Sequence, residues 1–101
     1  MDQKQPKMTT YQQEISDRIG GCSLKYIDGA WSLWKKLNDH YDIEILGSYC
    51  RSDPFTVVIY DISRGEWHPP VVERYDDIAS LAALEHIVTE ANWKYSARAK
   101  A

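Results

Sequence analysis

The stretch IEILGSYCRSDPFTVVIYDI, residues 43–62, decides the fold. Both ends of this stretch are rich in β-branched and aromatic residues, which favour strands, and the cluster at residues 51–54 is typical of a turn. The stretch therefore predicts an antiparallel hairpin in which Cys50 lies opposite Phe55. In that register both faces are largely apolar. We therefore expect a helix on one face, and a further strand or a partner, including a second copy of the chain, on the other.

A third strand is expected directly after this hairpin. Residues 63–66 have turn composition, and residues 67–73 can then pair as a strand. Pro69 and Pro70 cannot donate hydrogen bonds to a ladder, so this strand is expected at the edge of the sheet.

The C-terminal part of the chain predicts a long helix over residues 77–96. Its apolar residues recur at spacings of three and four, which is typical of a helix with one buried face: Leu81, Leu84, Val88, Ala91 and Tyr95. Asp76 or Asp77 is expected to cap its first turn, where a carboxylate accepts from free backbone N–H groups.

A short helix is expected over residues 10–19. Thr10 and Gln13 fit a capping box, Tyr11, Ile15 and Ile19 form one stripe, and the glycine pair 20–21 ends the helix.

The segment 23–41 allows two interpretations. Asp28-Gly29 is a strong signal for a two-residue hairpin turn. The apolar residues after it recur at helical spacing, and this spacing accounts for more residues. We therefore expect a helix over residues 29–39.

Together these elements predict one small α+β domain, with a short antiparallel sheet packed by the C-terminal helix and by one or two N-terminal helices. Residues 1–8 are expected to form a flexible tail, residues 9–97 the domain and residues 98–101 a basic tail.

Charge is strongly polarised along the chain. Residues 39–90 hold eleven carboxylates and three arginines, a net of −8, whereas residues 1–38 carry +2 and residues 91–101 carry +3. If the acidic residues converge on one surface, that surface attracts basic partners.

Targeting and redox signals are absent from the sequence. No charged start leads into an apolar run, and the longest apolar-rich run, residues 55–60, is too short to span a membrane. Cys22 and Cys50 match no metal or redox spacing, so we expect two reduced thiols in a cytoplasmic protein, with a single disulfide as the less favoured alternative.

Catalytic motifs are also absent, and we expect neither an enzyme nor a cofactor. His40, Asp42 and Glu44 lack the ligand spacing of a metal site, so no metal is expected. His86 and Glu90 have the spacing of an ordinary helical surface pair.

The favoured function is a non-enzymatic binding protein that docks an acidic, aromatic surface on a basic partner protein. Small size, acidity and the lack of catalytic motifs are typical of accessory or inhibitor proteins of bacteria, phages and mobile elements. The expected contact residues interleave carboxylates with large aromatics: Asp53, Glu66, Trp67, Glu73, Tyr75, Asp76 and Asp77.

Two other functions remain open. The basic termini could contact nucleic acid, although the acidic middle makes this less favoured. A small enzyme or ligand carrier would centre on His40, Cys50 or His68.

Overall fold

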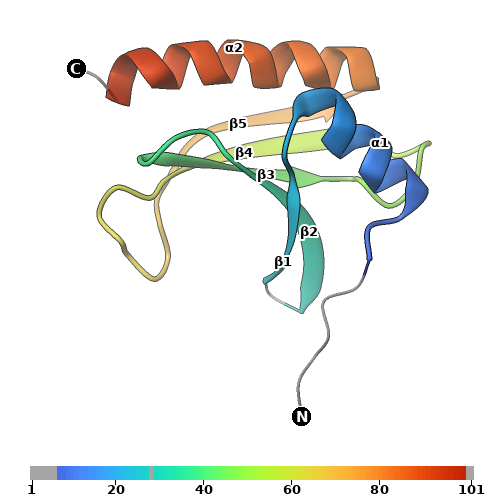
Figure 1. Ribbon diagram of the computed structural model, residues 1–101, viewed down its shortest axis with the longest axis horizontal. Coiled ribbons are helices and arrows are strands. Elements are labelled where there is room, and N and C mark those ends of the chain that lie inside the picture. The colour runs from blue at the N-terminus through green and yellow to red at the C-terminus, as the bar shows by residue number, and fades with distance from the viewer. Residues whose placement is uncertain (1–6, 28, 100–101) are drawn as a thin grey trace.

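The computed structural model describes residues 7–27 and 29–99. Two helices and five strands follow one another along the chain in the order α1 (Thr10–Ile19), β1 (Ser23–Ile27), β2 (Ala30–Lys36), β3 (Tyr41–Leu46), β4 (Phe55–Asp61), β5 (Val71–Ile78) and α2 (Leu81–Ala99). The strands form one antiparallel sheet in chain order, β1-β2-β3-β4-β5 (Figure 1). The expected α+β class is confirmed.

The capping box of helix α1 lies one residue earlier than the sequence suggested. Thr9 is the N-cap: its hydroxyl accepts from the Gln12 backbone N–H at 3.0 Å, and the Gln12 side chain accepts from the Thr9 backbone N–H at 3.0 Å. The capping box predicted at Thr10 and Gln13 is therefore wrong by one position, while the helix bounds are as expected.

The helix expected over residues 29–39 is wrong, because this segment belongs to the β1–β2 hairpin. Leu24 lies opposite Leu33, and β2 continues across to β3 with Leu33 opposite Ile45. Gly29 has φ +83°, a conformation that glycine adopts cheaply in hairpin turns; Asp28 lies outside the described residues. Pairing on both sides buries Leu33 fully, and this tertiary gain outweighs the local helical spacing.

The hairpin at residues 43–62 exists, but the predicted register with Cys50 opposite Phe55 is wrong. Tyr41 pairs with Asp61 and Leu46 with Thr56, so residues 47–54 form a wide loop. The shift is an odd number of residues and moves one strand's side chains to the other face. As a result Ile43 meets Ile59 in the core.

A glycine explains why the loop begins where it does. Gly47 has φ +85°, and a Cβ atom there would lie 2.2 Å from the backbone oxygen of Pro54. The two ends of the loop approach each other more closely than any residue with a side chain allows, so β3 stops at Leu46.

The last strand and the last helix both begin later than expected. The edge strand predicted at 67–73 runs over Val71–Ile78, and the helix predicted at 77–96 runs over Leu81–Ala99. Asp76 and Asp77 lie in β5 and are not helix caps. Instead the Ser80 hydroxyl accepts from the Ala83 backbone N–H at 3.1 Å. Strand pairing with β4 extends β5 through Asp76 and Asp77, so the helix begins after Ser80.

The core lies between the sheet and the two helices, which cover the same face. Helix α2 crosses this face, while the β1–β2 hairpin and the β4–β5 loop extend toward the opposite side (Figure 1). The stripe predicted on α2 is confirmed, since Leu84, Val88, Ala91 and Tyr95 are all buried. They pack with apolar residues of the sheet and α1: Ile15, Leu24, Leu33, Ile43, Ile45, Phe55, Val57, Ile59 and Ile78.

The two predicted tails fall partly beyond the described residues, which exclude 1–6 and 100–101. Of the basic tail, Arg98 belongs to α2, and its guanidinium lies 5.0 Å from the centre of the Tyr95 ring. Among the described residues, neither helix combines the length and the apolar composition that crossing a membrane requires.

Candidate functional site

In the folded protein, several basic residues of the two chain ends form ion pairs with carboxylates of the acidic middle. Four cations from the two ends of the chain meet carboxylates of the acidic middle: Arg18–Glu85 at 3.3 Å, Lys25–Asp42 at 3.7 Å, Lys36–Asp39 at 3.2 Å and Lys94–Glu73 at 3.1 Å. The acidic middle therefore does not form a single bare surface. The same pairing occupies cations that a nucleic-acid interface would need.

The expected contact residues separate into two regions. Asp53 lies in the β3–β4 loop, at the end of the sheet beside α1 (Figure 1). All the others lie on β5 or on the loop that leads into it from the opposite end: Glu66, Trp67, Glu73, Tyr75, Asp76 and Asp77. The fold thus brings most of the predicted set to one edge and leaves Asp53 apart.

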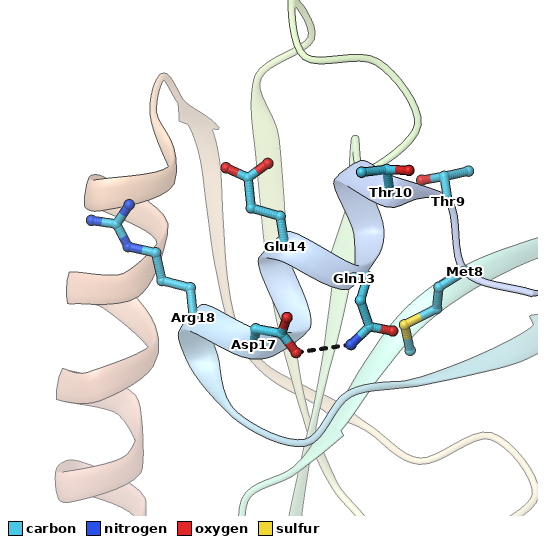
Figure 2. A pocket seen from close by; sticks show the side chains of 7 residues that line it. All are labelled: Met8, Thr9, Thr10, Gln13, Glu14, Asp17 and Arg18. Atoms are coloured by element: carbon cyan, nitrogen blue, oxygen red, sulfur yellow. Dashed lines mark hydrogen bonds between the residues drawn. The ribbon is translucent and has the colours of Figure 1, made fainter.

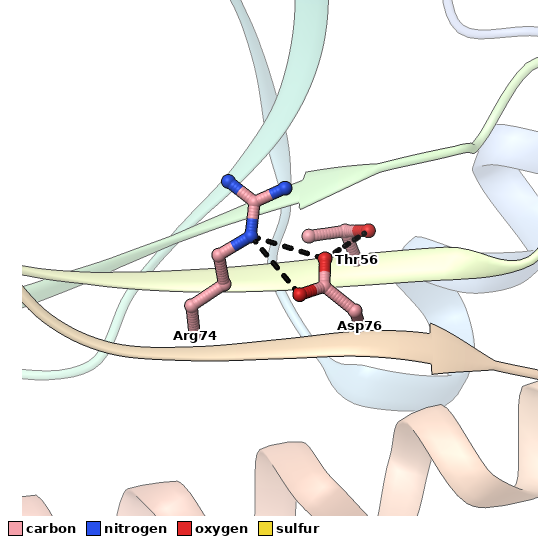
Figure 3. Close-up of polar contacts among 3 residues, drawn as sticks. All are labelled: Thr56, Arg74 and Asp76. Atoms are coloured by element: carbon pink, nitrogen blue, oxygen red, sulfur yellow. Dashed lines mark hydrogen bonds and ion pairs between the residues drawn. The ribbon is translucent and has the colours of Figure 1, made fainter.

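Alternation along β5 divides these residues between the two faces of the sheet. Glu73 and Tyr75 lie opposite Ile59 and Val57, on the face covered by α2. Asp76 projects to the other face, where Arg74 Nε donates to its two carboxylate oxygens at 3.0 and 3.2 Å and Thr56 Oγ1 donates at 3.3 Å (Figure 3).

Glu73 is the best-connected carboxylate of this edge. Tyr95 Oη donates to its Oε1 at 2.6 Å, and Lys94 Nζ donates at 3.1 and 3.2 Å. Desolvation raises the pKa of Glu73, but hydrogen bonds from Tyr95, Tyr75 and Lys94 outweigh it and lower the pKa overall. Burial and the Glu73 carboxylate raise the pKa of Tyr75 to about 12 and also raise that of Tyr95. Glu73 therefore stays ionised and ties β5 to α2.

A hollow of about 510 Å³ lies beside this tie, between β5 and α2. Its lining is mainly apolar and comes from both elements: Tyr75, Thr89, Glu90, Ala91, Trp93 and Lys94. Trp93 is 79% exposed at its rim. Trp93 was not among the expected contact residues for a protein partner, although a signal existed: it is a large apolar side chain that falls outside the buried stripe of α2.

Further apolar side chains are exposed on β5 and on the loop that leads into it. Val71 and Val72 at the start of β5 are 54% and 40% exposed. Trp67 in the β4–β5 loop, which extends to the side of the sheet opposite α2, is 90% exposed, and within the described part of the chain the His68 ring lies against it. Trp67 is therefore not a core residue. We call Trp67, Val71, Val72, Tyr75 and Trp93, with the hollow, the β5-edge site.

A second hollow, of about 660 Å³, is a poorer candidate. It follows the outer side of α1, where Figure 2 shows polar side chains such as Gln13, Glu14 and Asp17 spread along an open helix surface. Polar side chains of this hollow already form hydrogen bonds within the protein: Gln13 donates to Asp17 at 2.8 Å, and Glu14 accepts from Arg51 at 2.5 Å.

The sheet face opposite the helices is closed by its own side chains. The Glu44 carboxylate is buried there and accepts from Tyr60 Oη at 2.7 Å and Ser32 Oγ at 3.0 Å. Trp34 stacks on Tyr60 with ring centres 5.2 Å apart, and Lys25 lies 4.9 Å from the Trp34 ring. This layer satisfies the Glu44 carboxylate internally, and a hollow of about 300 Å³ lies beside Lys25, Trp34 and Asp42.

Metal binding finds no support within residues 7–27 and 29–99, where no group of three or more potential ligands gathers. Asp42 is paired with Lys25 and Glu44 is held by Tyr60, while His40 lies in the turn between β2 and β3.

The three residues considered for a small enzyme also lie apart. His40 and His68 belong to turns at one end of the sheet, and Cys50 belongs to the β3–β4 loop at the other end. Both cysteines are free thiols: Cys22 is half-buried and Cys50 is exposed. A hydrogen bond with Ser52 lowers the pKa of Cys50, whereas burial raises that of Cys22.

Comparison with known proteins brings no assignment. No protein-family model, curated protein or solved structure matches this chain. The functional argument therefore depends on the residues of the β5-edge site.

Proposed function

We propose that this protein is a non-enzymatic, cytoplasmic protein-binding domain of the accessory or inhibitor type, which docks on a basic partner protein through the β5-edge site. The observation that carries the proposal is the exposure of two tryptophans: Trp67, at 90%, lies in the loop that leads into the edge strand β5, and Trp93, at 79%, lies on α2 at the hollow beside that strand.

An exposed tryptophan leaves a large apolar area in contact with water, which is unfavourable unless a partner covers it. A tryptophan side chain removes a large apolar area from water when buried, and protein interfaces are enriched in this residue for that reason. Single exposed apolar residues are ordinary in monomeric proteins. Here Val71 and Val72 are exposed between the two tryptophans in the chain, on the strand that borders the hollow.

Acidic side chains accompany these apolar residues. Glu66 lies next to Trp67, and Asp76 and Asp77 lie along β5. Asp77 is exposed and has no ion pair among the described residues. Apolar anchors with charged neighbours give affinity at the centre of an interface and steering at its border, which supports a basic partner.

Binding is better supported than catalysis because the site offers anchors but no reactive pair. The residues that sequence reasoning considered for chemistry, His40, Cys50 and His68, lie at opposite ends of the sheet.

The test compares three versions of the protein as bait: wild type, the double variant Trp67→Ala/Trp93→Ala, and the control Tyr26→Ala. Tyr26 is 50% exposed on β1, the opposite edge of the sheet. A true partner is captured by wild type and control, and is lost by the double variant. All three proteins should unfold at nearly the same denaturant concentration, because such exposed substitutions typically change stability by about 0.5 kcal/mol or less.

The captured protein is then purified and titrated against each variant. A binding constant weakened about tenfold or more by the double variant, with the control unchanged, supports the proposal. Equal binding by all three proteins, or retention of nucleic acid alone, would contradict it.

A further inference from the structure

We propose that β5 accepts an extended, basic segment of the partner as a sixth strand of the sheet, with an apolar side chain of that segment seated in the hollow beside Trp93. This inference rests on the proposed protein-binding function and specifies the chemistry and conformation of the partner.

The first support is the open backbone edge of β5. Among the described residues this strand pairs with β4 alone. An edge strand directs the N–H and C=O groups of alternate residues away from the sheet, and these groups can pair with another chain. Its centre is regular: residues 73, 74 and 75 lie opposite 59, 58 and 57, and the irregular pairings lie on either side.

The second support is the position of the hollow. Side chains of an added strand alternate between the two faces, as those of β5 do. The side chains that point to the helix layer reach the hollow between Tyr75 and Trp93, which has room for a large apolar group in its 510 Å³. Those on the other face lie beside the Arg74–Asp76 pair, where a lysine or arginine shares the Asp76 carboxylate with Arg74 and Thr56.

The third support is charge complementarity. Strand β5 carries Glu73, Asp76 and Asp77 against Arg74, a net of −2. Glu73 is paired with Lys94 on the wall of the hollow and Asp76 with Arg74, so Asp77 is the carboxylate of β5 that has no ion pair among the described residues. Glu90 adds a carboxylate on the wall of the hollow, and the ion pair described for it is with His86 at 3.2 Å, which is charged only when protonated. A basic segment is therefore attracted to this edge.

The same charges disfavour a second copy of the chain as the occupant. Two β5 strands bring together two segments of net −2. An antiparallel pair centred on Tyr75 sets Glu73 opposite Asp77 but Arg74 opposite Asp76, whereas a pair centred on Asp76 or on Arg74 sets two like charges directly opposite each other. Like charges placed directly opposite each other destabilise a strand pair.

The probe is a synthetic peptide of about ten residues, long enough to cover the eight residues of β5. Lysine alternates in it with valine, and one central valine is replaced by phenylalanine to fill the hollow. Binding is measured by titration calorimetry, and the contacted amides by hydrogen exchange over residues 71–78. Three control peptides accompany it: one with glutamate in place of lysine, and two with N-methyl groups on alternate amides in the two complementary patterns.

We expect the lysine peptide to bind and to slow hydrogen exchange in β5. The N-methyl pattern that blocks the amides facing β5 should weaken binding about tenfold or more, while the complementary pattern leaves it within about threefold, because strand addition uses only one edge of the peptide. The glutamate peptide should not bind measurably.

Two matched protein variants locate the charge effect. Glu90→Lys should weaken binding of the lysine peptide about fivefold or more, since it replaces an attraction with a repulsion. Asp17→Lys makes the same charge change on the exposed side of α1, away from β5, and should leave binding within about twofold.

Several results would overturn the inference: no binding of the lysine peptide, stronger binding of the glutamate peptide, equal effects of the two N-methyl patterns, or self-association of the protein that slows exchange in β5. In each case the proposed function stands or falls separately. If the tryptophan variants still lose their captured partner, the partner docks by another geometry; if they do not, the protein-binding proposal itself fails.

Discussion

Replacing Tyr95 with phenylalanine tests the tie between α2 and β5. The Tyr95 side chain is fully buried, and its hydroxyl donates to Glu73 at 2.6 Å. The substitution keeps the ring in the core and removes this one donor. Hydrogen bonds to charged groups contribute about 1.5–3 kcal/mol. Glu73 retains Lys94 at 3.1 Å, so we expect a loss near the middle of that range, about 2 kcal/mol.

The loss can be measured by urea denaturation and by thermal unfolding at pH 7. For a domain of this size each kcal/mol corresponds to roughly 4–8 °C in Tm, so the variant should melt about 8–16 °C lower. A double-mutant cycle with Glu73→Gln assigns the loss to the pair, with an expected coupling of about 1–2 kcal/mol.

Tyr26→Phe is the matched control for this experiment. Tyr26 is 50% exposed and no hydrogen bond of its hydroxyl is found within the described part of the chain. Its substitution should change the free energy of unfolding by no more than about 0.5 kcal/mol. If Tyr95→Phe proves equally mild, the hydroxyl does not hold Glu73, and our account of the β5–α2 tie is refuted.

Three further changes test other parts of the fold. Gly47→Ala should lower the free energy of unfolding, measured by urea denaturation, by roughly 2–4 kcal/mol, because residue 47 has φ +85° and its new Cβ would meet a backbone oxygen at 2.2 Å. Gly65→Ala is the control: residue 65 has φ +64° and open space around it, so its substitution should cost only about 1 kcal/mol. Equal losses in the two variants would show that the close approach is not the cause. Folding lowers the pKa of Glu73, so the stability that its carboxylate contributes is fully present above the ordinary pKa of 4.5 and is lost as the pH falls through the lower folded value. The difference in unfolding free energy between wild type and Glu73→Gln should therefore shrink below about pH 4.5. A difference that grows there would contradict a stabilising role for the ionised Glu73. Alkylation of Cys50 by iodoacetamide near pH 7 should slow in Ser52→Ala, because the hydrogen bond that lowers the thiol pKa is removed; an unchanged rate would show that Ser52 does not hold the thiolate.

Local sequence patterns predicted correctly those helices and strands in which the apolar residues of the pattern are also the buried residues of the structure. The stripe on α2 was readable because Leu84, Val88, Ala91 and Tyr95 all face one way in a helix and all become buried. The strands at β3 and β4 were readable from β-branched composition, although their register was not, since it depends on which side chains become buried against the helices once the whole sheet has formed.

The segment after Gly29 shows where local patterns fail. Its apolar spacing favours a helix, and its turn signal favours a hairpin. Nothing in the local sequence decides between these two structures. Pairing of β2 with both β1 and β3 decided the outcome, because a central strand gains contacts on two sides.

The candidate site divides in the same manner. The sequence pointed to the residues from Glu66 to Asp77, because acids and aromatics alternate there. It did not join Trp93 to these residues, because that link comes from the packing of α2 over β5.

By itself the sequence determined the α+β class, the amphipathic final helix and the concentration of carboxylates in its middle. Composition and short-range periodicity are sufficient for these properties. Tertiary structure alone decided that Arg18, Lys25 and Lys94 pair with Glu85, Asp42 and Glu73, and that β5 remains at the edge with a hollow beside it. Strand register and charge pairing join residues that are distant in the chain, and their energies exist only once the chain has folded.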